Sequence, residues 1–253
     1  MGSLIGSSFR NALAMRLNGT NQYGWVDNPT FKTDTVACFS FWIKLNALLT
    51  VDGIQSIIVY GVNIAGNDAT FNIGVRRNLT ATGTGTYLSV LIRATHGGAN
   101  IGYAGTTTPL VAGAWMYCEV EDTGSAWAMR INNVSQTMTL NIGVSANTGG
   151  WLGDLSGASH KLVIGNSYNS NALGSTWFAG VVDEINYFSA ITGAQSTLMY
   201  NGGTPINPHR VQFGSAWKSW WRCGDSRDTN AILYDEIGTN NITLVNTPTF
   251  VTP

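Results

Sequence analysis

The 253-residue sequence predicts an all-β fold, a sandwich or barrel of antiparallel strands. Apolar residues recur with a period of two in almost every apolar segment, and clusters of Gly, Asn and Thr separate these segments. No long helical pattern occurs anywhere in the chain. Since residues two apart in a strand point to the same face of a sheet, this alternation gives each strand one face to bury.

The first clear strand is Cys38–Leu45, in which Phe39, Phe41, Ile43 and Leu45 share one face. The same alternation predicts further strands at 56–60, 71–76, 88–93, 116–121, 127–131, 137–142, 161–165 and 178–188. Asn132-Asn133 supplies a turn after one of them. The segment 192–200 breaks the pattern and reads as one short helix, N-capped by Thr192 and stopped by Gly202-Gly203.

Composition and charge restrict the partners. The formal net charge is -1, so there is no global positive field to collect phosphates, and nucleic acid is not expected as a partner. No apolar run reaches about 18 residues, so no membrane insertion by a helix is expected. Charged residues are only 11% of the chain, and the deficit is filled by Gly, Asn, Thr and Ser, a texture typical of secreted or virion-surface proteins.

The texture changes after Pro205, which suggests a sandwich domain over residues 1–204 and a C-terminal extension over 205–253. About forty residues are too few for an independent core, so we expect the extension to pack on the sandwich or on a neighbouring subunit. Trp217, Trp220 and Trp221 are too dense for one face, and we expect another subunit to cover some of them.

Three stretches carry a family resemblance: 17–23 with 39–44, 113–115 with 127–133, and 178–188 followed by the short helix. Together, over residues 9 to 202, they resemble the laminin G-like branch of the concanavalin A-like lectin/glucanase superfamily. The resemblance implies a jelly roll of two antiparallel sheets. A segment similar to 220–245 precedes the jelly roll in many relatives and follows it here, an order associated with phage virion proteins of this class.

The glucanase branch of this superfamily needs acidic residues that alternate on one strand. Glu119 and Glu121 share a face, but the central Asp of the usual E-x-D-x-E pattern is missing, so no catalytic residues are expected. The three histidines, at 96, 160 and 209, have no partner at a suggestive spacing and are expected at the surface or in turns.

Asp183 alternates with Val181, Ile185 and Tyr187, which predicts a carboxylate on an apolar face. A buried carboxylate must be hydrogen-bonded, paired or bound to metal. One interpretation is that Asp183 accepts backbone N–H groups and fixes a loop. The family resemblance implies another, a Ca²⁺ ion held by Asp183 with help from Asp27.

Aromatic side chains in polar loops are candidates for ligand binding. Trp151 lies with Asp154 in a Gly-rich loop, and Tyr168 and Trp177 lie in the loop segment 166–176 or beside it. Such rings can stack on a sugar, anchor a protein neighbour or only pack their own loop.

The leading hypothesis is a non-catalytic phage virion surface protein, either a capsid decoration or a tail or fibre component. It would form homo-oligomers, contact other virion subunits and attach to surface glycans. The alternative is a free-standing carbohydrate-binding lectin, and a glycoside hydrolase ranks third.

Overall fold

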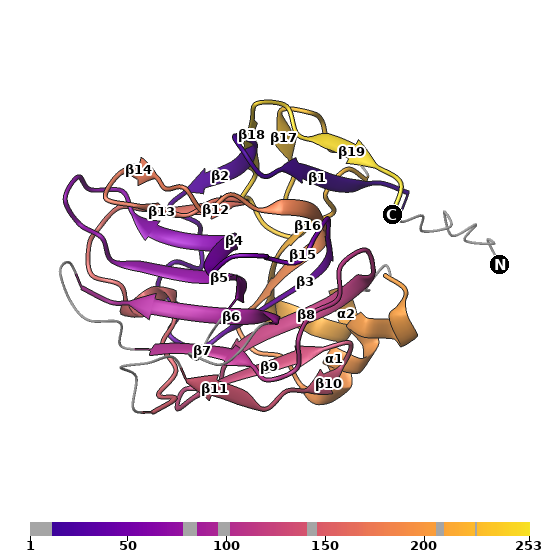
Figure 1. Cartoon of the computed structure of the whole chain (residues 1–253), viewed down its shortest axis with the longest axis horizontal. Helices are drawn as coiled ribbons and strands as arrows, with labels where there is room; N and C mark the ends of the chain where they lie inside the picture. Colours follow the sequence, from indigo (N-terminus) through magenta and orange to yellow (C-terminus); the bar gives the residue numbers. More distant parts are fainter. Residues whose placement is uncertain (1–11, 78–84, 96–101, 141–145, 206–209, 226) are drawn as a thin grey trace.

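The computed structural model describes residues 12–77, 85–95, 102–140, 146–205, 210–225 and 227–253. Two large antiparallel sheets form a sandwich, with the core between them, as the sequence predicts (Figure 1). Sheet A has the order β10 (Val134–Ser135), β9 (Trp127–Ile131), β8 (Trp115–Asp122), β3 (Cys38–Leu45), β15 (Ala179–Phe188), β1 (Ala14–Asn18) and β19 (Thr249–Val251), and β16 (Trp217–Trp221) also pairs with β15.

Sheet B is longer by one strand and includes the central hairpins of the chain. Its order is β11 (Met138–Leu140), β7 (Gly102–Thr106), β6 (Thr86–Arg93), β5 (Thr70–Arg77), β4 (Gly53–Val62), β12 (His160–Ile164), β2 (Tyr23–Asp27), β18 (Ile242–Val245) and β17 (Ile232–Leu233). A separate small hairpin consists of β13 (Tyr168–Asn169) and β14 (Ala172–Leu173).

The predicted alternation fills the core. Phe39, Phe41, Ile43 and Leu45 of β3 are at most 1% exposed and face sheet B. The opposite face of sheet A is also covered, because Trp42 of β3 belongs to a second cluster with residues of α1 and β16. Sheet A is therefore buried on both sides.

The predicted short helix is α1 (Gly193–Tyr200). Thr192 accepts the Gln195 N–H, and Gln195 in turn bonds the Thr192 N–H, a reciprocal cap that satisfies two donors of the first turn. Asn201 ends the helix in the left-handed conformation. The remaining helical elements are short: α2 (Arg210–Phe213) and the 3₁₀ turns η1 (Leu152–Asp154), η2 (Asn201–Gly203) and η3 (Gly214–Ala216). Within the described residues, no helix is long and apolar enough to cross a membrane.

The C-terminal extension adds strands to both sheets. β16 pairs with β15 and β19 with β1 in sheet A, while β18 pairs with β2 in sheet B. Trp217, Trp220 and Trp221 are all at least 93% buried within the single chain. The expectation that another subunit covers some of them is therefore wrong. Trp221 packs into the core and Trp217 and Trp220 into the second cluster. Trp217 and Trp220 share a face because the pairing of β16 with β15 shifts register between Tyr187 and Phe188.

β15 contains a bulge that moves Asp183 to an unexpected face. Glu184 has a positive φ of 46°, and the pairing with β3 shifts register between Asp183 and Asn186. An extra residue reverses the alternation, so Ile185 points into the core while Asp183 does not. Asp183 pairs with Trp42 of the second cluster, on the outer side of sheet A. Its carboxylate is buried, as predicted, but on the other face.

Candidate functional site

The outer face of sheet B carries a group of aromatic side chains, which we call the aromatic surface: Tyr23, Trp25, Tyr168 and Trp177, with Lys161 among them. Tyr23 and Trp25 alternate along β2 with Val26, which packs into the core, so their rings face outward. Both rings, and that of Trp177, stay partly exposed. These partly exposed rings gather around a buried apolar floor, made by Val59 and Val163.

Lys161 crosses the middle of the aromatic surface. Its ammonium lies 3.9 Å from the centre of the Trp25 ring and 5.4 Å from that of Tyr168. Asp27, which pairs with Lys161 across β2 and β12, lies 3.5 Å from the same ammonium. Cation–π contacts of this kind contribute about 0.5–1 kcal/mol at exposed sites, so Lys161 favours the observed orientation of the Trp25 ring.

The β13–β14 hairpin folds over the outer face of sheet B and positions Tyr168. The hairpin crosses β4 at Gly61, where a Cβ atom would overlap the Tyr168 carbonyl. The Tyr168 hydroxyl, which has one proton to donate, lies within hydrogen-bond distance of two acceptors, the side-chain oxygens of Asn63 and Asn171. Burial, and then the negative charge of Asp27, raise the pKa of Tyr168, so its hydroxyl stays protonated and donates. Tyr168 is only 5% exposed, which makes it a wall of the surface.

Trp177 closes the surface on the other side of Tyr23. The two ring centres are 6.0 Å apart at an angle of 58°. Flat aromatic faces beside carboxylate, amide and ammonium groups can stack on the apolar face of a sugar ring and bond its hydroxyls. The aromatic surface therefore has the chemistry of a glycan site.

The structure separates the four predicted ligand-binding residues. Tyr168 and Trp177 belong to the aromatic surface, but Trp151 is fully buried in the core, where its indole N–H donates to the Tyr187 hydroxyl at 3.0 Å. The Gly-rich loop around Trp151 turns the indole inward, so the third interpretation, packing of its own loop, describes it. Asp154 is exposed, and its carboxylate accepts the backbone N–H of Trp151 at 2.8 Å.

Asp154 lines a shallow cavity of about 310 Å³ with Asp122. The Asp122 carboxylate is 2% exposed and accepts N–H bonds from Gly124 and Gly150. These contacts fix the loops, as expected of a buried carboxylate.

The two residues implied as calcium ligands do not fit one ion. Asp27 lies on the outer face of sheet B, and Asp183 lies on the outer side of sheet A, with the core between them. The Asp183 carboxylate accepts the N–H of Glu184 at 2.9 Å. In the described ranges, no three His, Cys, Asp or Glu side chains gather as a metal site.

Glu119 and Glu121 share a face, as predicted, and both approach Arg130 of β9, at 3.1 and 3.5 Å. Glu119 also accepts the Tyr117 hydroxyl at 2.7 Å and is fully buried. Its carboxylate is engaged in the second cluster's polar network and does not reach solvent.

Similar solved structures share this architecture at low sequence identity. A candidate carbohydrate binding protein from Bacteroides ovatus matches with a TM-score of 0.63 and 15% identity over 95% of this chain and 60% of the other. The heptameric SAP-like pentraxin of Limulus polyphemus matches with a TM-score of 0.52 and 12% identity over 92% and 94%. The CBM40 module of the Ruminococcus gnavus IT-sialidase, bound to α2,3 sialyllactose, matches with 0.55 and 13% over 77% and 100%.

The chain has a lectin-like jelly-roll fold. It spans less than two thirds of the length of the Bacteroides ovatus protein. No protein-family model and no curated protein matches the sequence.

Sequence reasoning missed Tyr23, Trp25 and Lys161 as site residues. A signal was present, because Tyr23, Trp25 and Asp27 alternate in one short segment, which places two rings and a carboxylate on one face of a strand. What the sequence does not contain is the pairing of β2 with β12, which brings Lys161 between the rings.

Proposed function

We propose that this protein is a non-catalytic carbohydrate-binding module and that the aromatic surface is its glycan site. The observation that carries the proposal is the group of rings on the outer face of sheet B. Tyr23, Trp25 and Trp177 are partly exposed there, and Lys161 lies over the Trp25 ring. The similar folds support it, since one of them is a carbohydrate-binding module with a bound sialyllactose. This is the function that the sequence ranked second.

The experiment is a glycan array on the full chain, followed by calorimetric titration of the best glycan. Trp25→Ala removes the central ring, and stacking rings are typical hot spots, so we expect affinity to fall at least tenfold. Trp115→Ala is the matched control, because Trp115 is a partly exposed Trp on the outer side of sheet A. Binding that survives Trp25→Ala, or no binding to any glycan, would refute the proposal.

The virion-surface location, and with it the homo-oligomer and the contacts to other virion subunits, stays a prediction that rests on the low charge and the order of segments. None of the similar structures reported above is a virion protein. Mass photometry of the purified chain tests the oligomer directly: a discrete assembly is expected, and a monomer at micromolar concentration would contradict it.

A further inference from the structure

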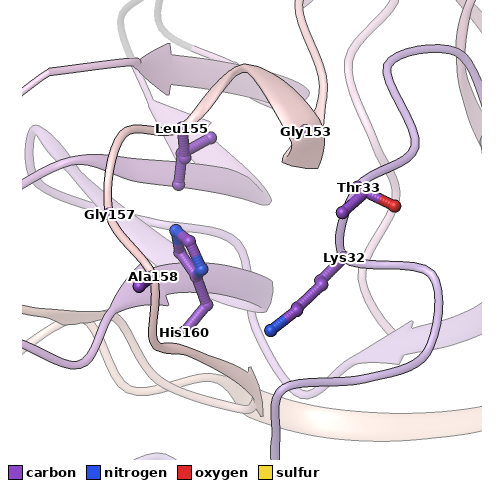
Figure 2. A pocket seen from close by; sticks show the side chains of 7 residues that line it. All are labelled: Lys32, Thr33, Gly153, Leu155, Gly157, Ala158 and His160. Carbon is purple, nitrogen blue, oxygen red and sulfur yellow. The ribbon is translucent and has the colours of Figure 1, made fainter.

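A second pocket lies where β2 ends and β12 begins, away from the aromatic surface (Figure 2). Its volume is about 290 Å³, near the lower end of small-ligand sites. It is lined by Lys32, Thr33, Gly153, Leu155, Gly157, Ala158 and His160. His160 and Lys161 are neighbours on β12 and point to opposite faces, so the pocket and the aromatic surface share only this strand.

His160 is a buried polar side chain whose ring nitrogens make no well-formed hydrogen bond within the described residues. It is 5% exposed, and its ring stacks on Tyr60 with centres 4.8 Å apart. Neither ring nitrogen has a hydrogen-bond partner among the described residues. Buried polar atoms in native proteins are almost always bonded, so an imidazole of this kind beside a cavity is suited to bind a ligand that enters it.

Lys32 brings a positive charge to the same pocket. In Figure 2 the Lys32 side chain extends toward His160, whose ring points toward Leu155. The ammonium donates to the Asn28 side-chain oxygen at 3.2 Å, and no carboxylate in the described part of the chain pairs with it. Since an ammonium has three N–H donors, two remain for a ligand.

Asn28 contacts both Lys32 and His160. Its side-chain oxygen also accepts the His160 backbone N–H at 3.1 Å, and its own N–H donates to the His160 carbonyl at 2.9 Å. Asn28 has a positive φ of 44°, a conformation that Asn tolerates well. Asn28 therefore links the Lys32 ammonium to the backbone of His160 through hydrogen bonds.

The pocket offers one full positive charge and one neutral donor. Burial lowers the pKa of His160, a contact with the Ser156 backbone opposes the shift, and the Lys32 charge lowers the pKa further. The imidazole is thus neutral at pH 7, with one N–H to donate. The two oxygens of a carboxylate can accept one N–H from the ammonium and one from the imidazole.

We propose that this pocket binds the carboxylate of a small organic acid, up to the size of a hexuronic acid. The carboxylate accepts from the Lys32 ammonium and from the His160 ring, while Leu155 and Ala158 contact the carbon skeleton. This inference does not depend on the glycan-binding proposal, because it concerns different residues on the other face of β12.

Calorimetric titration of the full chain with glucuronate tests the proposal, with glucose as the neutral match and inorganic phosphate as the other anion. We expect saturable binding of glucuronate, at least tenfold weaker binding of phosphate and none of glucose. Lys32→Gln should weaken glucuronate binding at least tenfold. Lys44→Gln, which removes the same charge from the outer side of sheet A, should leave it within twofold.

His160→Phe keeps the ring stacked on Tyr60 and removes the donor, so it should also weaken glucuronate at least tenfold. If circular dichroism shows that this variant does not fold, Lys32→Gln decides alone. Absence of glucuronate binding, equal binding of glucose, tighter binding of phosphate, or an unchanged affinity in Lys32→Gln would each overturn the proposal.

Discussion

At the scale of single residues, burial distinguishes tryptophans that stabilise the core from those that are available to a ligand. Trp151 and Trp25 both stand beside Gly in the sequence, yet one is fully buried and the other is partly exposed. Trp151 packs against Phe39 and Phe71 and bonds Tyr187, so it is a core residue. Trp25 has no such enclosure and leaves part of its ring to solvent.

Trp151→Ala should therefore reduce the free energy of unfolding by about 3–5 kcal/mol, the usual cost of truncating a buried Trp. Trp151→Phe should cost less, because it keeps most of the apolar volume. Urea denaturation measures both. Near-native stability of Trp151→Ala, combined with lost glycan binding, would instead make Trp151 a ligand-binding residue.

Glu184 makes stability depend on pH. Burial raises the pKa of this carboxyl to about 8, although Arg222 at 3.5 Å and the Trp220 indole N–H oppose the shift. Between the unfolded pKa near 4.5 and about 8, the folded chain holds a proton that the unfolded chain has lost. The contribution of Glu184 to the free energy of unfolding is therefore largest below about pH 4.5, and it falls as the pH rises toward 8.

The free energy of unfolding should drop between pH 5 and pH 8.5, and Glu184→Gln should remove a substantial part of that drop. Asp228, with a pKa raised to about 6, acts in the same direction and remains in both proteins. Urea denaturation at the two pH values gives the comparison. Equal drops in the two proteins would show that Glu184 titrates normally.

At the scale of elements, strands with strong alternation were predictable and the others were not. Cys38–Leu45 and the hairpin turn at Asn132-Asn133, where both residues have positive φ, follow directly from local pattern. β7 (Gly102–Thr106) was missed because Gly-Tyr-Ala-Gly-Thr has no apolar alternation. Gly102 is required there, since a Cβ would overlap the Trp127 ring, a tertiary fact that no local pattern carries.

Bulges and long-range pairing set the same limit for the candidate site. The face of Asp183 could not be read from alternation, because the bulge at Glu184 reverses it. Tyr168 and Trp177 were found from their loop, whereas Lys161 enters the site only through pairing between strands more than 130 residues apart. The sequence therefore predicts which residue types could form a site, but it does not predict which of them the strand pairing brings together.

The β13–β14 hairpin should depend on Gly61. Gly61→Ala forces a Cβ into the Tyr168 carbonyl, and overpacking of this kind costs about 1–3 kcal/mol. Hydrogen exchange should become faster across residues 168–173. Gly53→Ala is the matched control in the same strand, because nothing lies within 4 Å of its Cβ position. Unchanged exchange in Gly61→Ala would mean that the hairpin is not seated on β4.

At the scale of the whole molecule, the C-terminal extension completes both sheets. Asp235 is 1% exposed and accepts the Ser219 hydroxyl and the Trp220, Gly238 and Asn240 N–H groups at 2.8–3.1 Å. This carboxylate ties the segment after β16 to the strand itself. Because the extension also adds strands to both sheets, we expect it to fold together with the sandwich.

A chain truncated after residue 204 should not fold, because it exposes the edges of β1, β2 and β15 and the apolar residues beneath Trp217 and Trp221. Circular dichroism and thermal denaturation measure this. A cooperative transition near that of the full chain would show that residues 1–204 form an independent domain.

The central claim is that glycans bind on the outer face of sheet B. The most direct measurement follows the indole N–H signals of ¹⁵N-labelled protein by NMR during titration with the best glycan of the array. We predict that the Trp25 and Trp177 signals shift with a common saturation curve, while those of Trp115 and Trp127 stay in place. Shifts at Trp115 with none at Trp25, or no shift at any indole, would contradict the account.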